Sequence, residues 1–402
     1  MVIGIIGGGA SGMAAALAAA ENQDVQVLLF ERQARVGRKL QATGNGRCNL
    51  TNLGATVSHY HGDEPWFASY ALTRYGVDGT LKWFRSLGLY TVTETSGKVY
   101  PYSDQANSVL DVLRFALEKP NITVHSGKEI TRVKKQEDGF VLTAEGEAYF
   151  CHKLIVACGG LAGSKLGGSM WGYKLLRSMG HSCTRLRPAL VQLKSSWKGC
   201  VSLKGVRANC RAEIYRDGQL QSESTGELQF TDYGLSGPVI FEISRDVCQG
   251  GGLWQCRLDF LPEMESETLR AELSRRKGTN LSTEDLLTGI LHNRLGRVLT
   301  AAAGIRTMPC ADLTDRQIQE LICLVKGLEL DLTDTMGMDN AQVTAGGIIT
   351  GEFDETTMES RIVPGLYACG EVLDIDGDCG GYNLQWAWSS GRLAGASAGG
   401  KV

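Results

Sequence analysis

The sequence lacks a long apolar run, a recognisable signal peptide and closely paired cysteines. No segment of about 18 uninterrupted apolar residues occurs, so we expect no membrane-spanning helix. The apolar start, MVIGIIGGGASGMAAALAAA, has no positively charged beginning and contains a glycine run, so we expect no signal peptide. None of the 12 cysteines forms a Cys-x-x-Cys pair. We therefore expect reduced, buried thiols in a cytoplasmic protein.

The sequence also lacks an excess of charge of one sign. It contains no recognisable metal-binding pattern either. The 41 Lys and Arg residues nearly balance the 44 Asp and Glu residues, which leaves no basic field for nucleic acid and favours a small-molecule substrate. The six histidines contain no HExxH motif and no convergent pair, and His59 and His61 are expected to be solvated. Acidic residues alternate at Asp374, Asp376 and Asp378, but no glutamate completes an EF-hand loop. We predict no metal site, and no Ser-His-Asp triad can be read from the sequence.

Glycine, by contrast, is abundant, with 51 glycines in 402 residues. An apolar strand at residues 2–6 is followed at once by GGGASG, then by an alanine-rich helical segment and a second apolar strand, VQVLLFE, which ends at Glu31. In such a unit, Gly7 makes the tight turn, Gly9 lets the backbone approach a pyrophosphate, and Gly12 lets the helix pack on the strand. Glu31 would accept hydrogen bonds from both ribose hydroxyls. This arrangement suits FAD or NAD, whereas the carboxylate would repel the 2′-phosphate of NADP.

Three later segments favour FAD over NAD. Residues 37–52, GRKLQATGNGRCNLTN, bring positive charge and amides on a loop that could follow an extended dinucleotide. Residues 153–160, KLIVACGG, predict a strand that ends under the adenine half, preceded by the strand-like HSGKEITRV. Residues 363–395 predict a strand that ends at Gly370–Glu371 and then a second helix. The N-terminus of that helix would face the pyrimidine end of a flavin, where negative charge develops on reduction.

The predicted cofactor-binding residues come from these segments. In the second helix, Trp386 and Trp388 are two residues apart and cannot share a face, so one is expected beside the flavin and the other in the core. The full predicted set is Gly7, Gly9, Ala10, Ser11, Gly12, Glu31, Arg32, Arg38, Lys39, Thr43, Gly44, Asn45, Arg47, Cys48, Asn49, Glu129, Ile130, Ala157, Gly159, Gly370, Glu371, Gly381, Tyr382, Asn383 and Leu384.

Five motifs resemble those of the bacterial BaiN-like or YhiN-like NAD(P)/FAD-dependent oxidoreductases. They are GGGASG, GRKLQATGNGRCNLTN, FTDYGLSGPVI, DNAQVTAGG and CGEVLDIDGDCGGYNLQWAWSSG, and they span nearly the whole chain. The resemblance implies an α/β fold with a Rossmann-type FAD-binding domain formed by both termini, an inserted β-barrel-like domain and a small helical subdomain. The expected boundaries are 1–189 with 341–402, 190–264 with 327–340, and 265–326.

Patterning in the middle of the sequence agrees with this division. Short alternating runs such as CRAEIYR and LWQCRLDF predict strands. Helical patterns then follow over residues 266–278, 282–299 and 314–328. The expected N-caps are Ser266, Thr283 and Thr314.

The resemblance implies redox chemistry of a non-covalently bound FAD. No second GxGxxG motif follows a strand, so NAD(P)H would bind only transiently as an electron donor. The favoured reaction is NAD(P)H-dependent reduction of an activated C=C bond in an enone, such as a steroid or bile-acid-like substrate. Tyr382 or Tyr233 is expected to donate a hydrogen bond to the substrate carbonyl, and Arg47 is a third catalytic candidate.

Two other functions stay open at this point. The first is an FAD-dependent amine oxidase that acts on a small amino-ketone with O₂. The second is a flavoprotein that binds or modifies RNA, although a net charge of −3 weighs against it. The sequence does not indicate an oligomeric state.

Overall fold

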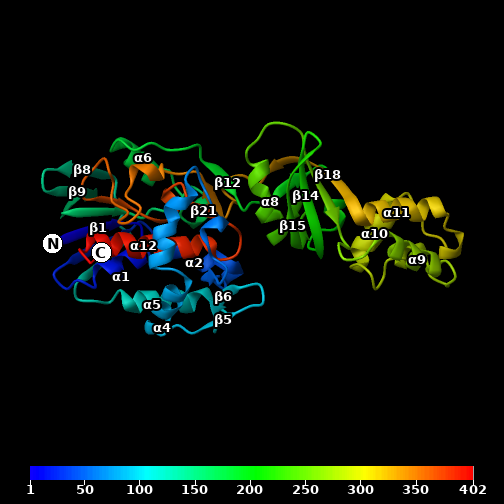
Figure 1. Cartoon of the computed structure of the whole chain (residues 1–402), viewed down its shortest axis with the longest axis horizontal. Coiled ribbons are helices and arrows are strands. Elements are labelled where there is room, and N and C mark those ends of the chain that lie inside the picture. Colours follow the sequence, from blue (N-terminus) through cyan, green and yellow to red (C-terminus); the bar gives the residue numbers. More distant parts are fainter. Residues whose placement is uncertain (402) are drawn as a thin grey trace. The chain divides into compact units, whose positions relative to one another are not determined.

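The computed structural model of the chain describes residues 1–401 and divides into two compact units (Figure 1). One unit comprises Met1–Arg187 and the chain from Gln342 onward, and the other is the intervening Pro188–Ala341. Each unit has its own cluster of buried apolar side chains. The chain therefore leaves the first unit once and returns to it, and segments from both ends of the sequence build one core.

The first unit is built on a five-stranded parallel sheet with the strand order β20-β11-β1-β2-β7. The register places Ile5 of the central strand opposite Leu29 on one side and Ile155 on the other. The central strands are short, apolar and largely buried, as is typical of parallel sheets covered by helices. The strands are β1 (Val2–Ile6), β2 (Gln26–Glu31), β7 (Ile122–Ser126), β11 (Lys153–Val156) and β20 (Leu366–Ala368).

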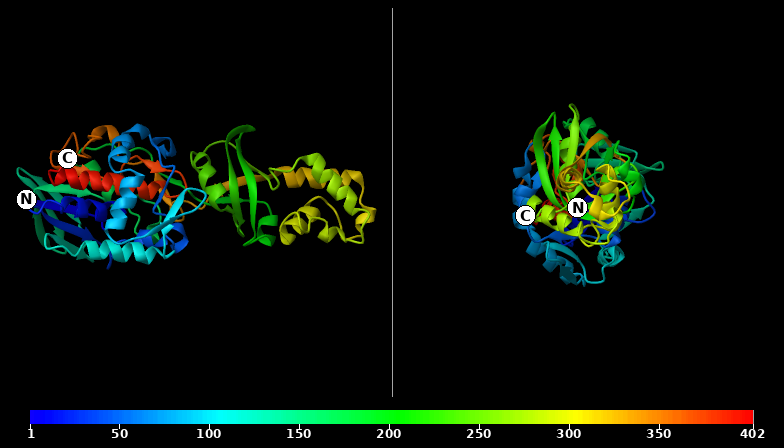
Figure 2. Two further views of the ribbon diagram at one scale, coloured as in Figure 1. Left: turned by 60° about the horizontal axis from the view of Figure 1, so that its bottom comes forward. Right: turned by 90° about the vertical axis from the view of Figure 1, so that its right-hand side faces the viewer.

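Helices from the two ends of the chain, α1 (Ala10–Ala19) and α12 (Tyr382–Ala398), pack against each other beside this sheet (Figures 1 and 2). The contact is close because two glycines of α12 face the backbone of α1. A Cβ at Gly391 would lie 2.3 Å from the Ser11 carbonyl oxygen, and one at Gly395 would lie 2.2 Å from the Ala15 carbonyl oxygen. A spacing of four residues puts both glycines on one helix face. The predicted helix after GGYNL is thus confirmed.

Smaller elements complete the first unit. An antiparallel sheet consists of β8 (Arg132–Gln136), β9 (Gly139–Ala144) and β10 (Glu147–Cys151). The other strands are β3 (Thr51–Asn52), β4 (Tyr60–His61), β5 (Thr91–Thr93), β6 (Lys98–Pro101), β19 (Val343–Ala345) and β21 (Asp376–Gly377). The other helices are α2 (Arg38–Ala42), α3 (Ala68–Arg74), α4 (Val77–Ser86), α5 (Ala106–Ala116) and α6 (Trp171–Ser178).

The second unit contains a closed barrel with the strand order β13-β16-β15-β14-β17-β18. The runs CRAEIYR and LWQCRLDF lie in two paired strands of this barrel, and Cys210, Ile214 and Cys256 among them are fully buried. The strands are β13 (Leu193–Ser195), β14 (Arg207–Arg216), β15 (Gln219–Phe230), β16 (Gly234–Ser236), β17 (Trp254–Asp259) and β18 (Leu328–Thr335).

Helices are inserted between the last two strands of the barrel. They are α9 (Ser266–Arg276), α10 (Asn293–Ala302) and α11 (Asp315–Gly327), while α7 (Gly199–Ser202) and α8 (Pro238–Val247) lie within the barrel segment. The single helix predicted over 282–299 is wrong, because only a 3₁₀ turn at Thr283–Asp285 precedes α10.

Of the three predicted N-caps, Thr314 is correct. Its side chain accepts from the Gln317 N–H in a complete capping box. Ser266 instead begins α9, after Glu265, which makes no side-chain cap hydrogen bond. The residue that caps the 3₁₀ turn is Ser282, not Thr283, since its side chain accepts from the Glu284 N–H. Because Ser282 and Thr283 both carry a hydroxyl group, the sequence pattern placed this N-cap one residue too late.

The predicted α/β fold is confirmed: a Rossmann-type domain formed by both termini, with an inserted barrel and helices. The finer division of the insert at residues 264 and 327 stays a prediction. Among residues 1–401, no helix combines the length and the apolar character needed to cross a lipid bilayer.

Candidate functional site

The predicted cofactor residues follow the carboxyl ends of the parallel strands. Gly7 follows β1, Glu31 ends β2, Ala157 follows β11, and Gly370 lies just beyond β20. Carboxyl ends of parallel strands share one edge of a sheet, and ligands of such sheets bind there. The loops at this edge lie very close to one another. A Cβ added at Gly7 would lie 2.3 Å from the Ala157 carbonyl oxygen, and one added at Gly370 would lie 2.5 Å from Ser11 Oγ.

The three glycines of the first turn have different surroundings. A Cβ at Gly12 would lie 1.8 Å from the Gly7 carbonyl oxygen, so this glycine is required for packing. Gly7 has a left-handed φ of 108°. Gly9, the N-cap of α1, has an ordinary φ of −79°, and a Cβ added to it would meet no atom within 4 Å. Fold packing therefore explains Gly7 and Gly12, whereas Gly9 leaves open space at a helix N-terminus, where anions bind.

The Glu31 carboxylate is oriented by the backbone. Its Oε2 accepts from the Gly8 N–H at 2.8 Å, and its Oε1 accepts from the Gln33 N–H at 2.8 Å. These bonds hold the carboxylate beside the glycine turn, while each oxygen keeps further acceptor capacity for hydroxyl groups. Arg32, the next residue, donates to the Gly167 carbonyl at 2.6 Å and lies 3.9 Å from Glu129. Glu129 is exposed, whereas Ile130 is buried.

The loop of residues 37–52 runs from the sheet edge to the start of α12. It has left-handed backbone at Gly37, Gly44, Asn45 and Cys48. Three of its residues contact the C-terminal segment: Thr51 Oγ1 donates to Gln385 Oε1 at 2.7 Å, Asn52 Nδ2 donates to the Gly380 carbonyl at 3.1 Å, and Lys39 Nζ lies 2.8 Å from Glu371 Oε2.

The remaining predicted residues of this loop divide by environment. Arg38 donates to the side chain of Gln33 at 2.6 Å, and Thr43 Oγ1 donates to the Leu40 carbonyl. Cys48 is buried, and burial raises the pKa of its thiol to about 12. A thiol in that environment stays protonated at neutral pH and fills space.

Asn49 is the polar side chain of this loop that fold packing does not explain. It is 8% exposed, and its buried Oδ1 accepts no hydrogen bond from the part of the chain that the structure describes. It lies at the N-terminus of α12, because a Cβ at Gly381 would come within 2.9 Å of Asn49 Oδ1. Gly381 itself has a φ of 103°. Buried acceptors without a partner are costly, so this oxygen points to a bound N–H donor.

The first turn of α12 is held by both neighbouring loops. Asn383 brackets Gly377, accepting from its N–H at 2.8 Å and donating to its carbonyl at 2.7 Å. Trp386 and Trp388 are both buried and have different partners, while the prediction that one of them flanks the flavin stays a prediction. Trp386 Nε1 donates to the Gly370 carbonyl at 3.2 Å, and Trp388 Nε1 donates to the Leu50 carbonyl at 2.9 Å.

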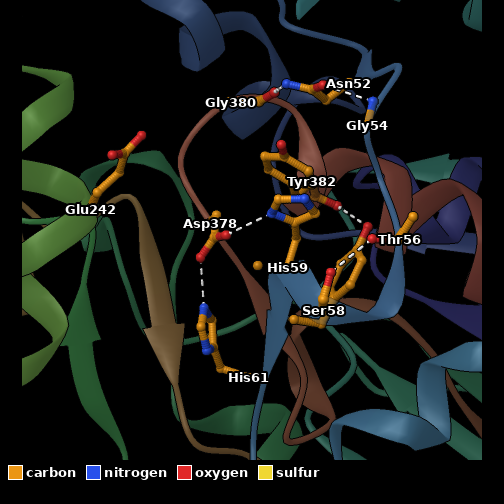
Figure 3. A network of polar contacts seen from close by, with 12 residues as sticks. Asn52, Gly54, Thr56, Ser58, His59, His61, Glu242, Asp378, Gly380 and Tyr382 are labelled. Carbon is orange, nitrogen blue, oxygen red and sulfur yellow. Dashed lines mark hydrogen bonds and ion pairs between the residues drawn. The ribbon is translucent and has the colours of Figure 1, made fainter. Parts of the chain in front are cut away.

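The structure corrects the prediction that the histidines form no convergent pair, because His59 and His61 meet at one carboxylate while both side chains stay partly exposed. Figure 3 shows the two imidazoles on either side of the Asp378 carboxylate. His59 Nδ1 lies 2.9 Å from Asp378 Oδ2, and His61 Nε2 lies 2.6 Å from Asp378 Oδ1. The ring of His59 also stacks on that of Tyr382, with centroids 4.5 Å apart. The sequence signal was present in two alternations, His-x-His and Asp-x-Asp-x-Asp, but their pairing is tertiary.

Two catalytic candidates lie in other surroundings. Arg47 pairs with Asp104 and, at 2.9 Å, with Glu94, and its guanidinium lies 3.9 Å from the Tyr100 ring centroid. The hydrogen bonds that Arg47 donates to Asp104 and Glu94 raise its pKa, and its catalytic role stays a prediction. Tyr233 lies in the second unit, in the short turn between β15 and β16. Its role as a hydrogen-bond donor to the substrate carbonyl stays a prediction.

A second histidine site is structural. His181 Nδ1 donates to Glu352 Oε2 at 2.9 Å, and Ser360 Oγ donates to His181 Nε2 at 3.0 Å. This is the order of a hydrolase triad, but Ser360 Oγ also accepts from the N–H groups of Ile362 and Val363 and is buried. A hydroxyl occupied in this way serves the turn and not an exposed substrate.

Comparison with known proteins agrees with the fold and identifies relatives. The family described as "HI0933-like protein Rossmann domain" matches residues 1–397. The chain is 44% identical to the 3-dehydro-bile acid delta(4,6)-reductase of Clostridium scindens, covering 98% of both chains. It is 34% identical to the ribosomal RNA dihydrouridine synthase of Escherichia coli K12, covering 96% of this chain and 95% of the other. A solved 3-ketosteroid delta1-dehydrogenase from Sterolibacterium denitrificans shares the fold, with a TM-score of 0.51, 11% identity, and coverage of 100% and 99%.

Proposed function

Because the chain belongs to the HI0933-like family with a Rossmann domain, we propose that it is an FAD-dependent oxidoreductase that reduces a carbon–carbon double bond conjugated to a carbonyl group. NAD(P)H is the proposed electron donor. The similarity to the bile acid delta(4,6)-reductase supports a substrate that is a 3-oxo bile acid or a related steroid with unsaturation beside the carbonyl.

Two helix N-termini support the cofactor assignment. Open space lies at the start of α1, and a buried side-chain oxygen without a hydrogen-bond partner lies at the start of α12. Gly9 leaves space at the start of α1, where the pyrophosphate would bind, and Glu31 is oriented beside it to hold the ribose. At the start of α12, Asn49 Oδ1 would accept the imide N–H of the flavin, and the N–H groups at Gly381 and Tyr382 would face its pyrimidine oxygens. When bound there, FAD supplies hydride transfer.

The reaction class is supported by a property that two relatives share. A delta(4,6)-reductase for 3-dehydro bile acids and a dihydrouridine synthase both saturate a C=C bond conjugated to a carbonyl. In both cases one carbon accepts a hydride and its neighbour accepts a proton. The protein must therefore hold the carbonyl, orient the double bond and supply the proton. Tyr382 and Tyr233 remain our candidates for holding the carbonyl oxygen.

The test is an anaerobic half-reaction experiment on the purified holoprotein. NADH or NADPH should bleach the visible flavin absorption, and a 3-oxo-4,6-diene bile acid should then restore it with formation of the reduced steroid. A protein that stays colourless after incubation with excess FAD contradicts the cofactor assignment. Bleaching by a small amino-ketone, with no response to either nicotinamide, would instead identify an amine oxidase.

A second candidate function is reduction of a uracil base in ribosomal RNA, which the relative from Escherichia coli favours. The near balance of 41 basic and 44 acidic residues argues for the small substrate. Incubation of reduced holoprotein with unmodified ribosomal RNA, followed by mass spectrometry of its nucleosides, separates the two. Gain of two hydrogen atoms on uridine, without turnover of the bile acid, would establish the RNA substrate.

We also propose a cytoplasmic location. The 12 cysteines are all free thiols, and most are buried or half-buried. Unpaired thiols in this number fit a reducing compartment.

A further inference from the structure

The His59–Asp378–His61 cluster is more elaborate than the local fold requires. The strands that carry it, β4 and β21, each have two residues, and they pair through their backbones. The Asp378 N–H also donates to the His59 carbonyl at 3.0 Å. These backbone bonds already join the two segments. The two imidazole contacts to one carboxylate therefore call for a chemical explanation.

The cluster is rigidly connected to the proposed flavin site. Asn383, in the first turn of α12, donates to the carbonyls of Gly377 and Asp378, at 2.7 and 3.2 Å. Tyr60, next to His59, donates its hydroxyl to the Tyr382 carbonyl at 2.9 Å. The His59 ring itself lies over the Tyr382 ring (Figure 3). His59 is thus held one aromatic ring away from the N-terminus of α12.

The Asp378 carboxylate orients both imidazoles of the cluster. Burial alone would raise the pKa of Asp378, but hydrogen bonds from His61 and His59 outweigh burial and lower it. The carboxylate is therefore ionised at neutral pH, and each of its oxygens contacts one imidazole. His59 directs Nδ1 at the carboxylate, so its Nε2 is the nitrogen that can exchange a proton outside the cluster. The side chains of His59 and His61 keep 36% and 35% of their surface exposed, so both a substrate and water can reach the cluster.

We propose that His59 is the acid that protonates the substrate carbon next to the carbonyl group, with Asp378 and His61 as positioning residues. The inference rests on the proposed function and names its proton donor. Carboxylate-oriented histidines are a standard source of such protons. Tyr382 would then support the His59 ring, on which it stacks.

The proposed step balances. FAD, when bound, would supply the hydride that adds to the β-carbon of the enone, and the electrons of the double bond would move to the α-carbon and carbonyl oxygen. The Nε2–H bond of protonated His59 breaks as the new C–H bond forms at the α-carbon. Neutral His59 would then regain a proton from water, and NAD(P)H would be the source of the next hydride. The sum is enone plus NAD(P)H plus a proton, giving the saturated ketone and NAD(P)⁺.

The test separates the two half-reactions of His59→Gln, a variant that keeps an amide toward Asp378. Reduction of its flavin by NAD(P)H should match the wild type. Reoxidation by the 3-oxo-4,6-diene bile acid should slow by about 100-fold or more, which is the usual contribution of a general acid. Reoxidation by ferricyanide, which needs no proton transfer to carbon, should be unchanged. His292→Gln, at an exposed histidine that caps α10 in the second unit, is the matched control and should behave as wild type in all three reactions.

A measurement without turnover tests the contact directly. In ¹⁵N-histidine-labelled oxidised holoprotein, addition of the saturated 3-oxo bile acid should shift the Nε2 resonance that is lost in His59→Gln. Asp378→Asn should shift the resonances of both His59 and His61. Product binding without a shift at His59, or enone reoxidation of His59→Gln at the wild-type rate, would overturn the inference. If the wild-type flavin is itself not reoxidised by the enone, the proposed function fails first, and the two failures are thus distinct.

Discussion

At the residue scale, glycines of one motif serve separable purposes. Gly12 is needed for packing, because the atom that alanine would add lies 1.8 Å from a backbone oxygen. Gly9 has ordinary backbone angles and open space around its Cβ position. The motif thus combines a folding requirement with a binding requirement.

This difference yields a paired prediction. Gly9→Ala should melt within about 2 °C of the wild type, since fold packing is unaffected, but should bind FAD about tenfold or more weakly, equivalent to a loss of at least about 1.4 kcal/mol. Gly12→Ala should lose about 1–3 kcal/mol or more of unfolding free energy through overpacking. Thermal melts of the apoprotein and FAD titrations provide the measurements. Equal stability losses in both variants would contradict the assignment.

The packing of the fold explains the contacts of Leu50 and Thr51, but it does not explain the buried side-chain oxygen of Asn49. Its amide is buried beside Gly381, yet its oxygen has no acceptor role within the described chain. Neighbouring residues Leu50 and Thr51 are both committed to α12, through the Trp388 and Gln385 side chains. In this loop, two residues that stabilise the fold thus follow directly after one residue whose side-chain oxygen can bind a ligand.

At the element scale, α12 is fastened by two indoles on different sides. Trp386 holds the carbonyl of Gly370, which follows β20, and Trp388 holds that of Leu50, in the loop after α2. Trp388 also packs edge-on against Phe84, with ring centroids 5.1 Å apart. The helix start is therefore positioned by the sheet edge and by the loop of residues 37–52 together.

Replacing each tryptophan by phenylalanine should separate these contributions. Either change leaves a buried carbonyl without its donor, so each should cost about 1–3 kcal/mol of unfolding free energy. Trp386→Phe should also weaken FAD binding more than Trp388→Phe does, because Gly370 lies at the glycine turn near Ser11. Denaturant titrations and FAD affinities, measured on both proteins, decide the point. An equal effect of both changes on FAD affinity would count against it.

The buried His181 predicts acid sensitivity of the segment that joins α6 to residues 352–360. Burial lowers its pKa below the ordinary 6.5, and the hydrogen bond that His181 donates to Glu352 opposes this only partly. Below pH 6.5 the unfolded chain therefore binds a proton that the folded chain does not, and stability falls as the pH decreases. The pKa of Glu352 is also lowered, because hydrogen bonds from Ser182 and His181 outweigh burial, and its contribution is lost only below about its ordinary 4.5.

This prediction is checked with His181→Asn. The unfolding free energy of the wild type should decline from pH 7 to pH 5, and the decline should be shallower in the variant. The comparison uses the slope, since the variant will be less stable at every pH. A variant with an unchanged or steeper slope over this range would show that other groups govern the acid response.

At the scale of the whole molecule, the two units have separate cores and the chain crosses between them only twice. The cofactor residues that we propose all lie in the first unit, whereas Tyr233 lies in the second. We therefore expect cofactor binding and substrate reduction to be separable. Residues 1–187 joined to residues 342–402 by a short Gly/Ser linker should fold and bind FAD, but should not be reoxidised by the enone.

The visible flavin spectrum, a thermal melt and the half-reaction assay measure these outcomes. A parallel protein of residues 188–341 should fold without FAD and show a cooperative melt. A linked first unit that folds but binds no FAD would show that the second unit contributes to the cofactor site. Enone reduction by the first unit alone would remove Tyr233 from the proposed chemistry.

The sequence by itself determined the features that depend on local order. The strand–glycine–helix–strand unit, the strand before Gly370, the helix after Gly381 and the alternating strands of the barrel are each encoded in contiguous residues. The five motifs that resemble those of the family indicated that both ends of the chain form one Rossmann-type domain. Local patterns were less accurate where neighbouring hydroxyls compete for a cap, as at Ser282 and Thr283.

Only the tertiary structure decided which distant polar groups meet. His59 and Asp378 are more than 300 residues apart in the chain, and no periodicity links them; they meet because two-residue strands pair at the start of α12. The partners of Arg47 and the buried Ser360–His181–Glu352 chain have the same origin. Hydrogen bonds between side chains depend on positions in space to within a fraction of an ångström, and those positions are set by how the elements pack.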